Sequence, residues 1–289
     1  MTDMITRFTR SLEIVQASIK VLRSDSRLLV LPLLSGAATA IVAGAFIWGA
    51  TASGAFAGME SGAGAQALPL WSYAWLFVFY FVQYFIIIFF NTALVGAGIA
   101  VLAGEEATVG SALTLAASRI VPIAGYALIS ATFGILLRMI AEKLGFLGRL
   151  IELGAGLAWT VATFLVVPVL AAEGVGPIKA IERSSELLRE TWGENIIGSS
   201  GISVVTSLIG AVVAVAGIGG GMMLVRRGAL PAGIALVSVS AAALIALALV
   251  GSALSGIYAG AVYYFALTGR PPRGFDGDLV RGAFAPKDA

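Results

Sequence analysis

Apolar residues are concentrated in six long stretches of the chain, and short polar segments separate them. A helix needs about 20 mostly apolar residues to cross the ~30 Å hydrocarbon layer of a bilayer. The pattern therefore predicts an all-α fold, a polytopic membrane helix bundle with about six transmembrane helices. The predicted spans are residues 28–52, 71–102, 120–141, 146–172, 196–225 and 229–268.

Charged residues interrupt the third and fourth spans more than the others. Arg138, Glu142, Lys143, Arg149 and Glu152 fall close together in the sequence, and charged side chains are costly in hydrocarbon. We therefore predict that this cluster marks a short hairpin at one membrane surface. The sixth stretch is long enough for either one helix or two, and the pattern does not decide between them.

Between the fourth and fifth spans lies the most polar stretch of the chain, residues 176–194. Pro177 stands in its first turn, where a helix tolerates proline. Small and apolar residues then recur at three- and four-residue steps, which is typical of an amphipathic helix lying on a membrane surface. The residues of this face are Ile178, Ile181, Ser184, Ser185, Leu188 and Trp192.

A similar amphipathic pattern occupies residues 1–27 and, more weakly, residues 110–125. Each such segment precedes a span, which indicates a weak internal repeat. We predict an N-terminal amphipathic helix at 1–27 and a six-span transmembrane domain at 28–268 that includes the interfacial helix 176–194. The tail at 269–289 begins with two prolines after Arg270 and is expected to be solvated and poorly ordered.

Composition agrees with a membrane protein and excludes several kinds of chemistry. Hydrophobic residues make up 59% of the chain and charged residues 12%, against about 25% charged residues in soluble domains. The chain has no His and no Cys, which removes His acid–base chemistry, thiol nucleophiles, disulfides and Cys/His metal ligation. The net charge of +2 is too small to indicate a nucleic-acid partner. We expect no cofactor and no metal.

The distribution of Lys and Arg predicts the orientation of the chain, because cytoplasmic loops of membrane proteins are enriched in these residues. With the N-terminus in the cytoplasm, 13 of the 18 Lys and Arg residues fall in inner segments and the other 5 in outer loops. We therefore predict a multi-pass protein of the cell (plasma) membrane with both termini in the cytoplasm.

Two segments carry a resemblance to a known family. "VVPVLAAEGVGPIKAIERSSELLRETWGENIIG" (166–198) and, upstream, "QYFIIIFFNTALVGAG" (83–98) resemble an uncharacterised prokaryotic family of six-span membrane proteins, a domain of unknown function. The resemblance covers most of the chain and implies a six-span bundle without catalytic residues. More loosely, the segment around Glu173 and Pro177 is similar to the membrane domain of some glycerophosphodiester phosphodiesterases. That likeness covers about one motif, and we expect no phosphodiesterase activity from it.

Polar side chains inside the predicted spans suit two interpretations. They can line a substrate or ion path, or they can form hydrogen bonds between helices, each contributing roughly 0.6–2 kcal/mol. The sequence favours hydrogen bonding between helices. The candidate positions are Gln83, Tyr84, Asn91, Thr160 and Thr163, together with Ser130.

Small residues recur at every fourth position in the last two spans. Such spacing lets helix backbones approach closely, within one chain or between two copies. "GIGGG" (217–221) lacks the Gly-Lys-Ser/Thr ending of a phosphate-binding loop, so helix packing is the favoured interpretation. The candidate packing residues are Gly217, Gly221, Ser252, Gly256 and Gly260.

The charged helix 176–194 offers a candidate partner-binding face made of Glu182, Glu186, Arg189 and Glu190. The simpler interpretation is a solvated connector between two spans. Elsewhere Arg149 and Glu152 stand three residues apart, where they could pair at the membrane surface or, less favourably, relay a proton. No catalytic residues are predicted.

Taken together, these patterns favour a non-enzymatic membrane protein that acts as a helix-bundle scaffold or binds partners in organising the envelope. The alternative is a transporter or channel whose path is lined by polar residues of spans 2 to 4. The lipid bilayer is the expected partner, with a homo-oligomer or a cytoplasmic protein as further possibilities.

Overall fold

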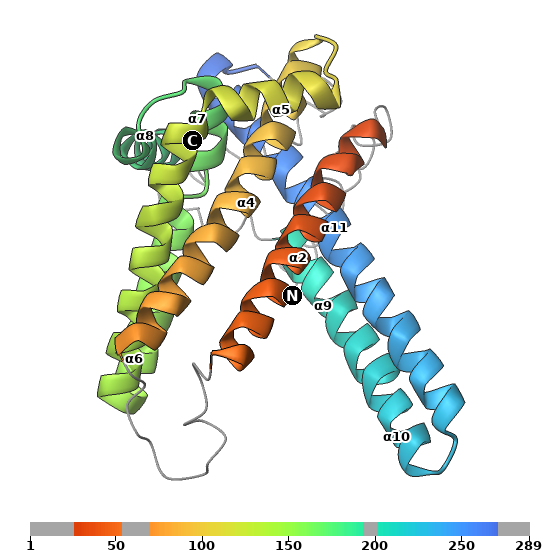
Figure 1. Cartoon of the computed structure of the whole chain (residues 1–289). Helices are drawn as coiled ribbons and strands as arrows, with labels where there is room; N and C mark the ends of the chain where they lie inside the picture. The colour runs from red at the N-terminus through yellow and green to blue at the C-terminus, as the bar shows by residue number, and fades with distance from the viewer. Residues whose placement is uncertain (1–25, 54–69, 193–200, 271–289) are drawn as a thin grey trace, which may run out of the picture. The chain divides into compact units, whose positions relative to one another are not determined.

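A computed structural model describes residues 26–53, 70–192 and 201–270, and these residues are almost entirely helical (Figure 1). The predicted helix at 1–27 lies outside the described residues apart from its last two positions, and residues 271–289 of the predicted tail lie outside them as well. In chain order the helices are η1 (Ser26–Leu29), α2 (Val30–Ala52), α4 (Leu70–Ala103), α5 (Val109–Ser118), α6 (Ile120–Ala162), α7 (Val166–Ala172), α8 (Pro177–Trp192), α9 (Gly201–Val213), η3 (Ala214–Gly219), α10 (Gly220–Arg226) and α11 (Leu230–Thr268).

Six helical segments are long and apolar enough to cross a membrane, which confirms the all-α, six-helix prediction. The last of them, α11, is one continuous helix, so the open question of one helix or two is decided in favour of one. The six segments are Val30–Ala52, Ala74–Ala103, Ile120–Ala141, Lys143–Ala172, Thr206–Arg226 and Leu230–Thr268.

Large apolar side chains are exposed along these segments. Trp48 is 75% exposed, Val239 67% and Ile245 62%. A soluble monomer rarely leaves large contiguous apolar surface in contact with water, because each Å² costs about 25 cal/mol. Lipid hydrocarbon would solvate these side chains without that cost.

The chain divides into two compact units, which are described separately. One comprises residues 33–96 and 109–188 and is called the α6 unit here. The other includes the described parts of residues 1–32, 97–108 and 189–289 and is called the α11 unit.

In the α6 unit, α2 packs against α4 through aromatic and small residues. The Phe46 ring lies 5.2 Å from that of Trp75 and 5.3 Å from that of Phe79, measured between centroids. Gly49 makes room for Trp75, whose ring lies 3.1 Å from where a Cβ would stand. Such tilted ring pairs contribute about 0.5–1.5 kcal/mol beyond the area that they bury.

Short helices lie across one end of the long helices in the α6 unit. Figure 1 shows α5 and α8 at the same end of α4 and α6. Gly125 of α6 lies against Pro177, the first residue of α8, and Gly96 of α4 lies against Leu115 of α5. Because glycine has no side chain, the two helices in each pair approach closely.

A buried hydroxyl attaches α8 to the break between α6 and α7. Ser184 Oγ donates to the carbonyl oxygen of Ala162 at 2.7 Å and accepts the N–H of Leu165 at 3.0 Å. Those two backbone groups lie where the fourth span leaves regular helical geometry, so the helix itself does not satisfy them. A serine on a neighbouring helix replaces the missing hydrogen bonds.

The face that α8 buries coincides with the predicted one only in part. Ala180, Ser184, Leu187 and Leu188 are buried, whereas Ile178 is 64% exposed. Of the predicted face, Ser184 and Leu188 are buried and Ile181 and Ser185 are half-buried, and the side chain of Trp192 lies outside the described residues. Hydrogen bonding through Ser184 and contact with protein rather than lipid rotate the buried face toward Ala180 and Leu187.

Within α6, the chain reverses direction at Gly145, which makes the two halves of this helix a hairpin. Gly145 has φ 56° and ψ −122°, values close to those of the first central residue of a type II′ turn. Gly148 then packs against the backbone of Ile140 and Ala141, where a Cβ would approach to 2.7 Å. The reversal lies inside the charged cluster at which the sequence predicts a hairpin.

Replacing Gly145 by alanine is expected to lower the free energy of unfolding by about 1–3 kcal/mol, because side chains other than glycine are strained at this φ and ψ. No neighbouring atom lies within 4 Å of the added Cβ, so backbone strain alone is tested. Thermal unfolding in detergent, followed by circular dichroism, measures it. Gly154→Ala is the control, because its added Cβ also has no neighbour within 4 Å but Gly154 does not have a positive φ. Equal stability of the two variants would contradict the turn assignment.

In the α11 unit, the helical series α9, η3 and α10 runs back along α11 as a second hairpin (Figure 1). Gly221 of α10 and Gly233 of α11 lie against each other, since a Cβ on either would meet the other's carbonyl oxygen within 3 Å. Gly217 lies against Ser240. Of the other predicted packing residues, Gly260 is buried, Gly256 is half-buried and Ser252 is exposed.

Candidate ligand-binding cavity between α4 and α6

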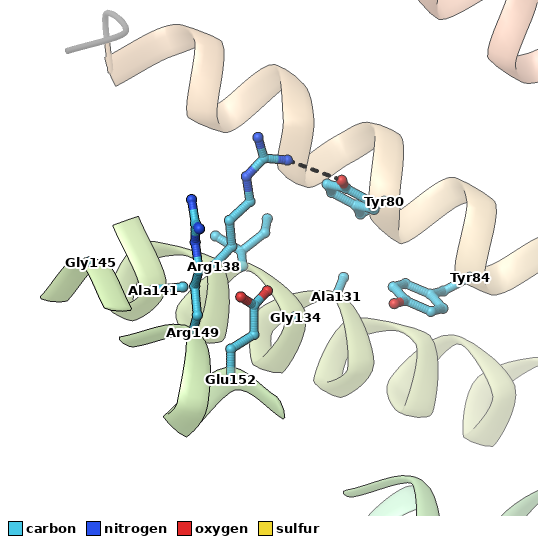
Figure 2. Close-up of a pocket in the computed structure, with 10 residues that line it drawn as sticks. Tyr80, Tyr84, Ala131, Gly134, Arg138, Ala141, Gly145, Arg149 and Glu152 are labelled. Atoms are coloured by element: carbon cyan, nitrogen blue, oxygen red, sulfur yellow. Dashed lines mark hydrogen bonds between the residues drawn. The ribbon is translucent and has the colours of Figure 1, made fainter. Parts of the chain in front are cut away.

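A cavity of about 530 Å³ lies between α4 and the two halves of α6, close to the Gly145 turn (Figure 2). Its volume is within the range of roughly 300–1,000 Å³ that is typical of small-molecule sites. Five of the lining residues are polar or charged, namely Tyr80, Tyr84, Arg138, Arg149 and Glu152. The others are small or apolar, namely Ala131, Gly134, Ile135, Ala141 and Gly145.

Helical spacing brings these residues together. Tyr80 and Tyr84 stand four residues apart on α4, so they share one face. Gly134, Arg138 and Ala141 share a face of the first half of α6 in the same way, and Arg149 and Glu152 share one on the second half. Gly134 leaves room for the Tyr84 ring, whose hydroxyl oxygen lies 3.8 Å from the place a Cβ would take.

The two arginines reach the cavity from opposite halves of the hairpin. Arg138 Nη1 donates to the Tyr80 hydroxyl at 3.5 Å, the long end of the hydrogen-bond range (Figure 2). No ion pair joins Arg149 to Glu152, although both residues are described. Among the described lining residues the charged ones are Arg138, Arg149 and Glu152, and the two guanidinium groups suit a ligand with an anionic group.

Of the predicted intramembrane polar residues, Tyr84 lines the cavity. Gln83 lies on another face of α4, where its Nε2 donates to the carbonyl oxygen of Thr39 on α2 at 3.2 Å. Its Oε1 is buried and has no hydrogen-bond partner among the described residues. Gln83 therefore forms a hydrogen bond between α4 and α2 and does not line the cavity.

The remaining predicted polar residues lie on the hairpin or on α4. Thr160 and Thr163 donate to carbonyl oxygens of their own helix, those of Gly156 and Trp159. Thr163 and Ser130 are also joined to Tyr126 by side-chain hydrogen bonds. Asn91 is half-buried on α4. None of Asn91, Ser130, Thr160 and Thr163 lines the cavity described above.

On α8, the predicted partner face consists of exposed Glu182, Glu186 and Arg189, and the side chain of Glu190 is outside the described residues. Glu186 forms an ion pair at 3.4 Å with Arg183, which also pairs with Glu173 at 3.5 Å. Desolvation lowers the pKa of Arg183, but the hydrogen bond to Glu186 and the charge of Glu173 outweigh it and raise the pKa above its ordinary value. Arg183 thus stays cationic at physiological pH.

Sequence reasoning missed Tyr80 and Arg138 as lining residues. The signal was present, because Arg138 follows Gly134 by four residues in a long apolar stretch and Tyr80 precedes Tyr84 by four on the neighbouring span. The sequence could not identify these two residues as lining a cavity, because it does not reveal which faces of two helices are in contact.

Comparison with known proteins identifies the family. A family of unknown function, DUF6159, matches residues 70–274, which include α4 to α11 and all residues that line the cavity. No curated protein matches the chain, and no solved structure does. The chain therefore belongs to the DUF6159 family.

Proposed function

We propose that this protein is a non-enzymatic integral membrane protein that binds an anionic ligand in the cavity between α4 and α6. The observation that carries the proposal is the convergence of Arg138, Arg149, Tyr80 and Tyr84 on one cavity of ligand size. Charge-assisted hydrogen bonds from arginine are about twice as strong as neutral ones. Tyrosine hydroxyls add donors that can orient the ligand.

The carboxylate content of the cavity supports binding rather than catalysis. Among the described lining residues Glu152 is the one carboxylate, and a single carboxylate does not supply the paired acid and base that general acid–base catalysis uses. A proton relay through Arg149 and Glu152 would need further titratable groups in line with them. The other polar lining residues are two tyrosines and two arginines, which supply hydrogen-bond donors.

The contacts beyond the cavity favour a blind pocket over a transport path. The rings of Phe133 and Trp159 stack at 4.2 Å between the halves of α6. Further along the hairpin, Tyr126 joins Thr163 and Ser130. A transporter or channel with a path along spans 2 to 4 would need water at these positions in at least one state.

For topology, we propose the plasma membrane with both termini in the cytoplasm, as the Lys and Arg distribution predicts. The α5 and α8 end of the α6 unit would then face the cytoplasm, and the Gly145 turn would face outward. A cytoplasmic partner for α8 and a homo-oligomer stay predictions. The likeness to the membrane domain of glycerophosphodiester phosphodiesterases also stays a prediction from one motif.

Single cysteines test the proposal, because the native chain contains none. Gly134→Cys is expected to react with a small negatively charged thiol reagent about tenfold faster than with a positively charged one of equal size, owing to the two arginines. Ser130→Cys and Thr163→Cys are expected to stay unlabelled from either side of sealed vesicles. Lys179→Cys serves as the accessible control on α8.

Adding Arg138→Gln and Arg149→Gln to Gly134→Cys is expected to remove the preference for the anionic reagent. The matched control, Arg226→Gln with Arg227→Gln, removes the same charge at the tip of the other hairpin and should leave the preference intact. Labelling of Ser130→Cys and Thr163→Cys from the opposite side would instead favour the transport alternative.

A further inference from the structure

We infer that the ligand of this cavity is a membrane phospholipid whose phosphodiester group binds between Arg138 and Arg149. The inference rests on the proposed function and names the class of its ligand. It is carried by three features of the hairpin: the position of the arginines relative to the turn, the apolar surface of the turn itself, and the charge of the cavity.

The first feature is depth. Arg138 stands seven residues before Gly145 and Arg149 four residues after it. At 1.5 Å per residue, both Cα atoms lie within about 10 Å of the turn. The polar headgroup layer on each side of a bilayer is roughly 5–8 Å thick, and arginine side chains extend toward it from the hydrocarbon. Both guanidinium groups can therefore reach the level of lipid phosphates.

The second feature is the apolar surface of the turn itself. Leu144 is 53% exposed, Phe146 76% and Leu147 66%. A loop that projected into water would leave these side chains in contact with solvent, at about 25 cal/mol per Å² of apolar area. Insertion of the turn among lipid headgroups and upper acyl chains removes that cost, which places the cavity mouth where phospholipids are the most abundant anions.

The third feature is the charge of the cavity. Arg138 and Arg149 line it from the two halves of the hairpin, so one phosphodiester group can accept hydrogen bonds from both guanidinium groups. The arginines alone would also suit a soluble phosphate compound, and it is their depth and the apolar turn that favour a phospholipid. Glu152 also lines the cavity and can accept hydrogen bonds from a headgroup amine or hydroxyl.

The test compares phospholipid retained by the purified full chain with binding of soluble phosphate. Native mass spectrometry after extraction in mild detergent is expected to show one phospholipid bound to the wild-type chain. Arg138→Gln with Arg149→Gln is expected to reduce the lipid-bound fraction about tenfold. The matched control, Arg226→Gln with Arg227→Gln, and the local control Lys143→Gln should retain the lipid. Circular dichroism checks that each variant is folded, and Arg149→Gln alone replaces the double variant if the latter does not fold.

The outcomes separate the two proposals. Loss of lipid confined to the Arg138 and Arg149 variants supports both. If the wild-type chain binds inorganic phosphate or glycerol 3-phosphate, detected as a thermal shift that needs these arginines, but retains no lipid, the lipid inference is overturned and the anion-binding function stands. Equal loss in the Arg226 and Arg227 control overturns the lipid inference as well. Binding of neither lipid nor soluble phosphate overturns both.

Discussion

Replacing Ser184 by alanine is expected to lower the free energy of unfolding by about 2–4 kcal/mol. The hydroxyl satisfies the Ala162 carbonyl and the Leu165 N–H at the break between α6 and α7, and Ser184 is fully buried. Alanine leaves both backbone groups in a buried site without that partner, and each unsatisfied group costs roughly 1–3 kcal/mol. Thermal and denaturant unfolding in detergent, followed by circular dichroism, measure the change.

The adjacent Ser185→Ala is the matched control. The Ser185 hydroxyl donates to the carbonyl oxygen of Ile181 in its own helix, so its removal breaks no contact between helices and should change stability by less than about 0.5 kcal/mol. Ser184→Ala should also loosen α8, with faster tryptic cleavage at Lys179 and Arg183. Equal stability and equal cleavage of the two variants would show that Ser184 does not hold α8 in place.

Alanine at Gly233 is expected to destabilise the hairpin of the α11 unit by about 1–3 kcal/mol, the range for overpacking a tight contact. The added Cβ would stand 2.7 Å from the Gly221 carbonyl oxygen and 2.9 Å from the Val225 backbone nitrogen. Backbone atoms cannot move aside as a flexible side chain can, so α10 and α11 must separate. Gly221→Ala meets Gly233 from the other side, and the double variant should cost less than the sum of the two singles.

Gly219→Ala is the control in the same series, because nothing lies within 4 Å of its added Cβ. Alanine is also the better helix former, so this variant should be neutral or more stable by up to about 1 kcal/mol. Unfolding in detergent ranks the variants, and a cysteine pair across α10 and α11 reports their separation through its rate of disulfide formation. If Gly233→Ala and Gly219→Ala behave alike, the close contact of the two helices is wrong.

The long helices could be predicted from the sequence because hydropathy is a local property. Stretches such as 28–52 and 229–268 are predicted by apolar length alone, and the structure has helices at Val30–Ala52 and Leu230–Thr268. The hairpin in α6 could be predicted too, because five charged residues interrupt an apolar run. Its glycine turn at Gly145 was not singled out, since positive φ is a property of the folded backbone.

The candidate cavity was predictable only in part. Tyr84 was singled out because it is polar inside a span, but Gln83, singled out for the same reason, faces α2 and bonds to Thr39. Neighbouring residues on a helix point in directions about 100° apart, so polarity alone cannot tell which of them meets a partner. Arg138 was assigned to the turn because charge in an apolar stretch is most simply explained by a loop.

Chain length and hydropathy by themselves determine that this protein is helical, that six segments can cross a membrane and that an amphipathic helix precedes the fifth, because these depend on residues near one another in sequence. The tertiary structure alone decides which side chains meet. It fixes the rotation of α8 through the hydrogen bonds of Ser184 and leaves Ile178 exposed. It also pairs Gly221 with Gly233 and brings Arg138, Arg149 and Tyr80 to one cavity. The physical reason is that rotation of a helix about its axis hardly changes the burial of a uniformly apolar span in lipid, so close packing and a few hydrogen bonds between helices select the faces in contact.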